Sequence, residues 1–146
     1  MLFLVCPGGE LEVSHHLPAH RAAAIWCTAA SAKYLLAGAE HGSIHAYAVT
    51  GAFEFLWSLP LQLGALTVDP VTCLAVRDET VVAGFTSGHI RVYRANLGEL
   101  AVEISAHVRP ITGLSIHPRE CLFCTCSEDQ YLSVRLLQTR YFVLLA

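Results

Sequence analysis

The chain has 146 residues, a length typical of one domain, and 54% of them are hydrophobic while 14% are charged. This composition excludes intrinsic disorder, because the chain has enough apolar residues to form a packed core. Nine Lys and Arg residues against 12 Asp and Glu residues give a formal net charge of −3. A phosphate-binding surface needs a basic excess, so we expect no nucleic-acid partner.

The N-terminal residues predict neither a signal peptide nor a membrane anchor. Residues 1–6 are apolar, but no basic residue accompanies them and the hydrophobic run ends before Pro7. The uncharged segment 55–68 contains Pro60 and Gly64 and is shorter than the roughly 20 apolar residues of a membrane-spanning helix. With six cysteines and no export signal, the sequence predicts free thiols and an intracellular, cytoplasmic protein without a membrane partner.

An internal repeat organises the rest of the chain. Residues 35–47 align without a gap with residues 81–93, and a more divergent copy covers residues 122–135. The turn residues of the three copies are Gly42, Gly88 and Gln130. Each copy is an apolar run, a tight turn and a second apolar run, which predicts two half-buried strands joined in a hairpin.

Alternating apolar residues predict a further strand after two of these hairpins. We expect Leu100, Val102 and Ile104 to share one strand face. The same pattern places a second set on one face: Phe53, Phe55, Trp57 and Leu59. Residues 22–34 leave two interpretations open, because their alanines favour a helix while the repeat favours strands.

A repeat of about 40–45 residues with four short strands is typical of a β-propeller blade, and this sequence resembles the WD40 family. Ala106-His107 resembles the Gly-His of that family, and residues 111–116 and 122–127 resemble its first two strands. The resemblance implies an all-β fold, a partial β-propeller of about three and a half four-stranded WD40-like blades. Its expected parts are a half blade at about 2–17 and blades at about 20–61, 70–105 and 107–144.

The resemblance also implies a structural hydrogen-bond tetrad in the last blade. His107, Thr125 and Asp129 match its His, Ser/Thr and Asp members, whereas Arg135 occupies the position of its Trp. His20 matches the Gly-His position of an earlier blade. The other copies depart further, with His41 and Ser87 at the Asp position and Tyr47 and Tyr93 at the Trp position.

Three and a half blades do not close a ring, because propellers contain about four to eight. A blade buries its faces only against its neighbours, so two apolar faces are expected to stay bare. Two interpretations remain: the chain is a fragment of a longer propeller, or two copies associate to give seven blades. A truncated product without independent function is a further alternative.

The residues His117, Cys121, Cys124 and Cys126 form the main rival site, because zinc binds these residue types. If residues 121–126 are a strand, Cys121 points away from the other two thiols, so we expect buried thiols and no metal.

Other polar residues have simpler interpretations. We expect His41, His45 and His89 at surface turns, and Arg91 and Arg94 at solvated strand ends.

The sequence therefore predicts a non-enzymatic scaffold that binds other proteins or peptides and needs no cofactor. Tyr131 and Phe123 are candidate anchors for a partner, although core packing is the better interpretation of Phe123. A small metal-binding or enzymatic domain built on His117 and the cysteines is the alternative function.

Overall fold

A computed structural model describes residues 2–5, 11–15, 17, 23–59 and 68–137, and this part of the chain consists of strands and turns. The strands are β1 (Leu2–Val5), β2 (Leu11–His15), β3 (Ile25–Ala30), β4 (Tyr34–Ala39), β5 (Ile44–Ala48), β6 (Phe55–Leu59), β7 (Val71–Arg77), β8 (Thr80–Phe85), β9 (His89–Arg94), β10 (Glu99–Ser105), β11 (Ile111–Ile116), β12 (Leu122–Ser127) and β13 (Leu132–Leu136).

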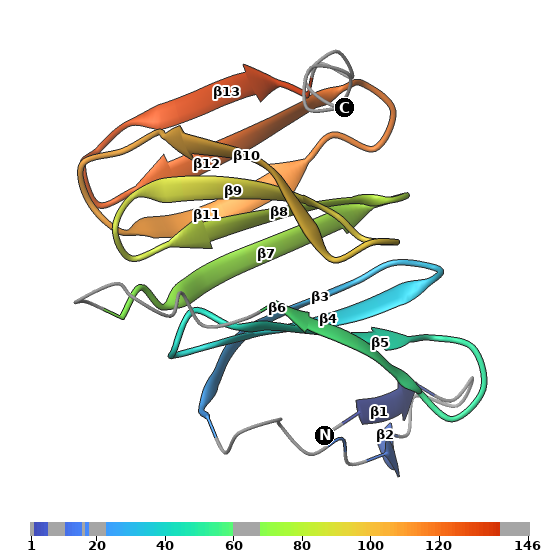
Figure 1. The fold of residues 1–146 in the computed structure, drawn as a ribbon. Helices are drawn as coiled ribbons and strands as arrows, with labels where there is room; N and C mark the ends of the chain where they lie inside the picture. Colours follow the sequence, from blue (N-terminus) through green and yellow to red (C-terminus); the bar gives the residue numbers. More distant parts are fainter. Residues whose placement is uncertain (1, 6–10, 16, 18–22, 60–67, 138–146) are drawn as a thin grey trace.

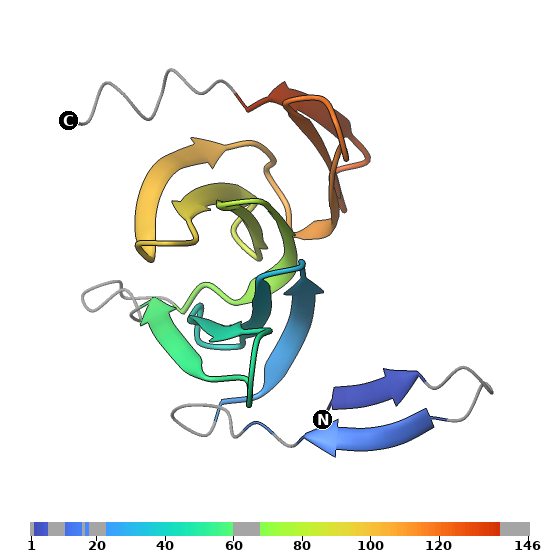
Figure 2. The same ribbon diagram turned by 90° about the vertical axis from the view of Figure 1, so that its right-hand side faces the viewer.

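The strands form an N-terminal hairpin and three antiparallel sheets. β1 pairs with β2, sheet 1 has the order β3-β4-β5-β6, sheet 2 has the order β10-β9-β8-β7, and sheet 3 has the order β11-β12-β13 among the described residues. The first strand of sheet 2, β7, contacts β3 of sheet 1 and β11 of sheet 3, so the sheets stack side by side about their first strands (Figures 1 and 2). The predicted all-β partial propeller is confirmed.

The structure places each sheet inside one predicted blade. The hairpin lies within residues 2–17, sheet 1 within 20–61, sheet 2 within 70–105 and sheet 3 within 107–144. Residues 138–144 of the last predicted blade, and His20 in the first full one, lie outside the described residues.

The first two strands of every sheet share one irregularity. The register shifts between Ile25 and Cys27, between Val71 and Cys73, and between Ile111 and Gly113. A bulge at the same place in three sheets is a property of the repeat. β3 is a strand, so the helical interpretation of residues 22–34 is wrong for Ile25–Ala30. Cys27 and Ala29 pack against sheet 2, and this packing overrides the helix propensity of alanine.

Two predicted strand faces are corrected by bulges in the fourth strands. Leu100 pairs with Tyr93 while Val102 pairs with Val92, so adjacent residues of β9 face residues two apart on β10. Adjacent strand residues point to opposite faces. Leu100 therefore does not share the face of Val102 and is exposed.

The same shift occurs in sheet 1, where Phe55 pairs with Tyr47 and Trp57 pairs with Ala46. Phe55 is exposed, whereas Trp57 packs into the core. An alternating pattern of side chains cannot reveal a bulge, because the inserted residue changes the face without changing the spacing.

The hydrophobic core consists of two layers, each between neighbouring sheets. The first layer joins sheets 1 and 2 through Leu36, Ile44 and Phe85. The second joins sheets 2 and 3 through Ile90 and Phe123, which confirms the core interpretation of Phe123. Each sheet is thus held mainly by the apolar faces of its neighbours.

Candidate interaction surface at the turn end of the sheets

The turns between the second and third strands of the three sheets lie on the same side of the stack, at one end of each sheet. We call this side the turn end. Their key residues have positive φ angles: 80° at Gly42, 83° at Gly88 and 73° at Gln130. The repeat alignment of Gln130 with the two glycines is thereby confirmed. A Cβ atom at Gly88 would lie 2.2 Å from the carbonyl oxygen of His107, so only glycine fits there.

At the turn end of sheet 3, the structure brings His107, Thr125 and Asp129 together. His107 Nε2 lies 2.9 Å from Thr125 Oγ1, and His107 Nδ1 lies 2.9 Å from Asp129 Oδ2. His107 and Thr125 are buried. In the neutral imidazole that suits both partners, Nδ1 donates to the carboxylate and Nε2 accepts from the hydroxyl. Arg135, at the position of the missing Trp, has a buried Nε without a hydrogen bond to the described residues.

The Asp129 carboxylate also fixes the backbone on both sides of it. Its Oδ2 accepts from the Val108 amide at 3.2 Å and its Oδ1 from the Tyr131 amide at 3.0 Å. Burial opposes ionisation, but the hydrogen bonds from Tyr131, His107 and Val108 outweigh it and lower the pKa of Asp129. Val108 and Tyr131 are 88% and 73% exposed. One carboxylate therefore fixes the backbone at two residues with exposed apolar side chains.

Sheet 2 has a different polar cluster at its turn end. Asp69 accepts from the Ser87 amide at 2.9 Å and from the Ser87 hydroxyl at 2.7 Å. The same hydroxyl lies 2.9 Å from Nδ1 of His89, which is half-buried. The Asp position of the repeat is thus occupied by a serine, and a carboxylate from the preceding loop binds it.

Arg91 is buried in this cluster, so the prediction of a solvated strand end is wrong. Its guanidinium donates to Glu103 at 2.5 Å and to Asp69 at 3.3 Å, and its Cζ lies 4.0 Å from the centre of the Phe85 ring. Two carboxylates and an aromatic face compensate for the loss of water around the cation.

His45 is also buried, which corrects its predicted place at a surface turn. It lies in β5, and its Nε2 is 3.3 Å from the Ser43 hydroxyl. His41, in contrast, is exposed in the turn as expected.

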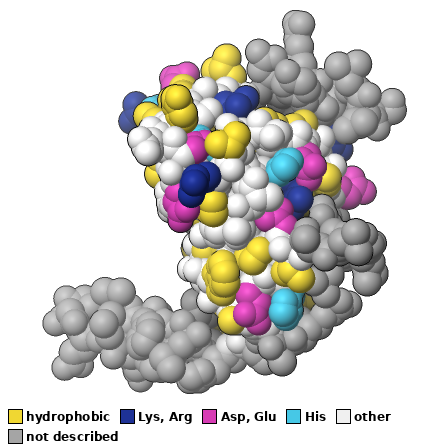
Figure 3. Space-filling model, turned by 90° about the vertical axis from the view of Figure 1, so that its left-hand side faces the viewer, with side chains coloured by type: hydrophobic (Ala, Val, Ile, Leu, Met, Phe, Trp, Pro, Cys, Tyr) yellow, Lys and Arg dark blue, Asp and Glu magenta, His cyan; other side chains and the backbone are white. Residues whose placement is uncertain are grey.

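The turn end carries acidic, basic, histidine and apolar side chains next to one another, without a patch of one charge (Figure 3).

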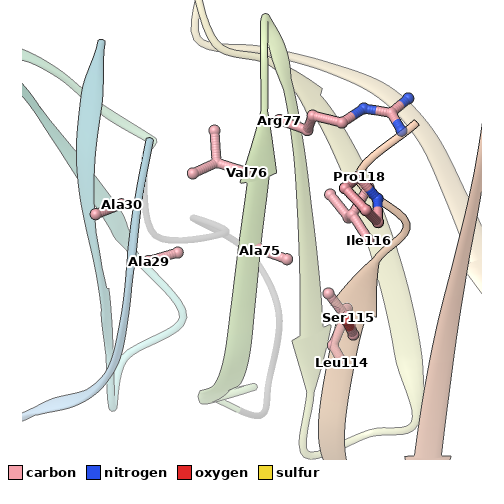
Figure 4. Close-up of a pocket in the computed structure, with 9 residues that line it drawn as sticks. All are labelled: Ala29, Ala30, Ala75, Val76, Arg77, Leu114, Ser115, Ile116 and Pro118. Atoms are coloured by element: carbon pink, nitrogen blue, oxygen red, sulfur yellow. The ribbon is translucent and has the colours of Figure 1, made fainter. Parts of the chain in front are cut away.

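A shallow pocket of roughly 440 Å³ lies among the first strands and the loop after β11 (Figure 4). Its walls are mostly small or apolar, and its lining residues are Ala29, Ala30, Ala75, Val76, Arg77, Leu114, Ser115, Ile116 and Pro118. Arg77 is already bound there by the carbonyl oxygens of His117 and Glu120.

The cysteines do not gather around an ion within the described part of the chain. No group of three His, Cys, Asp or Glu residues in that part could hold a metal. Cys121 and Cys126 are exposed and Cys124 is half-buried, so the prediction of buried thiols is wrong for Cys121 and Cys126. The His117 ring accepts from the amides of Arg119 and Glu120. Burial raises the pKa of the Cys27 thiol to about 12 and also raises that of Cys73, so both are poor nucleophiles.

Comparison with known proteins identifies the repeat. Residues 98–134 match the family WD domain, G-beta repeat. The WD repeat-containing protein 54 of Mus musculus is 37% identical over 54 residues, and the WD repeat domain 54 protein of Rattus norvegicus is 35% identical over 54 residues. Each match covers 37% of this chain and 16% of the relative, so the chain spans a small part of these relatives.

Two solved structures share the fold of this chain. The RRP9 WD40 repeats superpose on 81% of this chain with a TM-score of 0.71 at 19% identity, covering 36% of that chain. The computationally designed Ika4 protein superposes on 84% of this chain with a TM-score of 0.71 at 23% identity, covering 71% of that chain. At these identities the likeness shows the fold alone. Within the described residues, no helix is long and apolar enough to cross a membrane.

Proposed function

We propose that this chain is a non-enzymatic interaction module whose turn end binds proteins or peptides. The WD40 fold supports a scaffold role, because rigid sheets present many loops on one surface. The observation that carries the proposal is the pair Val108 and Tyr131, exposed apolar side chains whose amides bind the same carboxylate of Asp129. Anchors held in place lose little conformational freedom on binding, so they favour recognition.

Three further parts of the proposal concern context. The module functions as part of a larger propeller, since the described residues form three sheets and a hairpin. The further blades come either from a longer chain or from a second copy. The net charge of −3 and the mixed turn end favour protein partners over nucleic acid. The free cysteines of the described residues support a reducing, intracellular location such as the cytoplasm.

A selection with random linear peptides displayed on phage tests the proposed surface. Peptides selected on the chain are then measured by calorimetry against the double variant Val108→Ser and Tyr131→Ser. We expect at least about a tenfold loss of affinity, because the two changes remove the apolar anchors.

The matched control is Leu97→Ser, which removes an exposed apolar side chain between β9 and β10, at the opposite end of sheet 2. Its affinity for the selected peptides should stay unchanged. Peptides that bind the double variant as tightly as the original chain would contradict the proposed surface.

A further inference from the structure

The three sheets use equivalent positions to contact one another. We call the side of a sheet that faces the following sheet its forward face. Counted from the turn residues Gly42, Gly88 and Gln130, the forward faces contain Ile44, Ile90 and Leu132 at the same position of the third strand. Two residues further along the chain they contain Ala46, Val92 and Val134.

These equivalent positions differ sharply in exposure. Ile44 and Ala46 of sheet 1 are buried by sheet 2, and Ile90 and Val92 of sheet 2 are buried by sheet 3. In sheet 3, by contrast, Leu132 is 70% exposed and Val134 is 62% exposed. The forward face of sheet 3 thus presents the side chains that the two other sheets bury in a neighbour.

The opposite, rear faces show the reverse gradient. Val71 and Val81 of sheet 2 are buried against sheet 1, and Ile111 and Phe123 of sheet 3 are buried against sheet 2. In sheet 1 the equivalent of Val71 and Ile111 is Ile25, which directly precedes the same register shift and is 40% exposed.

Leu35, the sheet 1 equivalent of Val81 and Phe123, is half-buried. The chain therefore carries both sides of one sheet-to-sheet interface, with the rear side on sheet 1 and the forward side on sheet 3.

We propose that a second copy of this chain covers the forward face of sheet 3, with the rear face of its own sheet 1. The argument for this occupant is the repeat itself, since the forward positions of sheets 1 and 2 pack only against rear positions of the same fold. Sheet 1 of a second copy supplies such positions at Ile25 and Leu35. Two faces that differ from each other make a heterologous contact, and two copies close it twice when each sheet 3 meets the other sheet 1.

Sedimentation equilibrium of the 146-residue chain between about 1 and 200 μM measures the association, because the populated oligomer follows from mass action. We expect a concentration-dependent dimer. The variant Val134→Glu places a charge in the proposed apolar contact and should raise the dissociation constant by about 100-fold or more. Val68→Glu is the matched control, because this valine is 60% exposed, close to the 62% of Val134. Val68 lies in the loop before β7, outside sheets 1 and 3, so the change should leave association unchanged.

A mixing experiment tests the direction of the contact. Ile25→Glu alone should weaken the dimer as Val134→Glu does, with circular dichroism and urea unfolding showing that each variant remains folded. A mixture of the two variants retains one intact forward face and one intact rear face, so it should form a one-to-one heterodimer that neither variant forms alone.

Three results would overturn the proposal. The first is a chain that stays monomeric over the whole concentration range, which would leave the forward face to blades of a longer chain. The second is a dimer that Val134→Glu does not weaken. The third is a dimer that Val134→Glu weakens but Ile25→Glu does not, which would indicate pairing of two forward faces. Peptide binding at the turn end is measured separately, so either proposal can fail alone.

Discussion

Replacing Thr125 by valine tests the buried network of sheet 3 most directly. Valine has nearly the shape of threonine, so the change removes the hydroxyl without leaving a cavity. His107 Nε2 then loses its partner at 2.9 Å, and both side chains are too deeply buried for water to replace the bond. A buried acceptor without a partner costs about 1–3 kcal/mol of the free energy of unfolding.

Urea unfolding followed by circular dichroism measures this cost as a lower midpoint with an unchanged m-value. Thr112→Val is the matched control, because Thr112 is exposed and its hydroxyl makes long contacts with Cys126, 3.3 Å to the carbonyl oxygen and 3.6 Å to Sγ. The control should change the free energy of unfolding by less than about 0.5 kcal/mol. Equal effects of the two substitutions would refute a structural role for the His107–Thr125 hydrogen bond.

Three other predictions follow from the same structure. The pKa of Asp129 is lowered in the folded state, so the carboxylate stabilises the fold above the ordinary aspartate pKa, and this stability is lost as pH falls through the folded value. The free energy of unfolding, measured at a series of acidic pH values, should therefore depend less on pH in Asp129→Asn. Burial raises the pKa of Tyr34 and of Tyr93 to about 12, so a spectrophotometric titration should show tyrosine ionisation near pH 12. The amplitude of this ionisation should decrease in Tyr34→Phe and in Tyr93→Phe. The stability that the two neutral tyrosines contribute is present below the ordinary tyrosine pKa and is lost as pH rises through about 12. Gln130→Gly should raise the free energy of unfolding by up to about 1 kcal/mol, because glycine adopts φ of 73° without strain, and an unchanged or lower urea midpoint would contradict this reasoning.

The turns were predictable from sequence because their chemistry is local. Gly42 and Gly88 occupy a backbone conformation that favours glycine, so two glycines at equal places in similar runs defined the repeat. Gln130 could be aligned with them only because the flanking strands matched. His107, Thr125 and Asp129 were selected by resemblance, and their distances required the structure, since 22 residues separate the first from the last.

The buried polar residues were not predictable, because their partners come from elsewhere in the chain. Arg91 looks like an ordinary strand residue with one side in water, but Asp69 and Glu103 reach it from another loop and another strand. His45 follows a turn and reads as a surface histidine, yet β5 is a middle strand of sheet 1. The bulges were not predictable for a related reason. Leu100 belongs to an alternating run of apolar residues, but the register with β9 shifts between Leu100 and Val102.

The turn end and the stacking faces point in different directions, and this separates the two proposed interactions. Sheets follow one another along the stack, whereas the turns lie at one side of it (Figure 1). Association through Leu132 and Val134 would extend the stack and leave Val108 and Tyr131 open to a partner. The hydrogen bonds of Asp129 connect the proposed partner-binding turn of sheet 3 with the interior of that sheet, because the carboxylate bonds to the buried His107. A change that breaks this network should therefore reduce both the stability of sheet 3 and the order of the partner-binding side chains, while a change on the forward face should alter association alone.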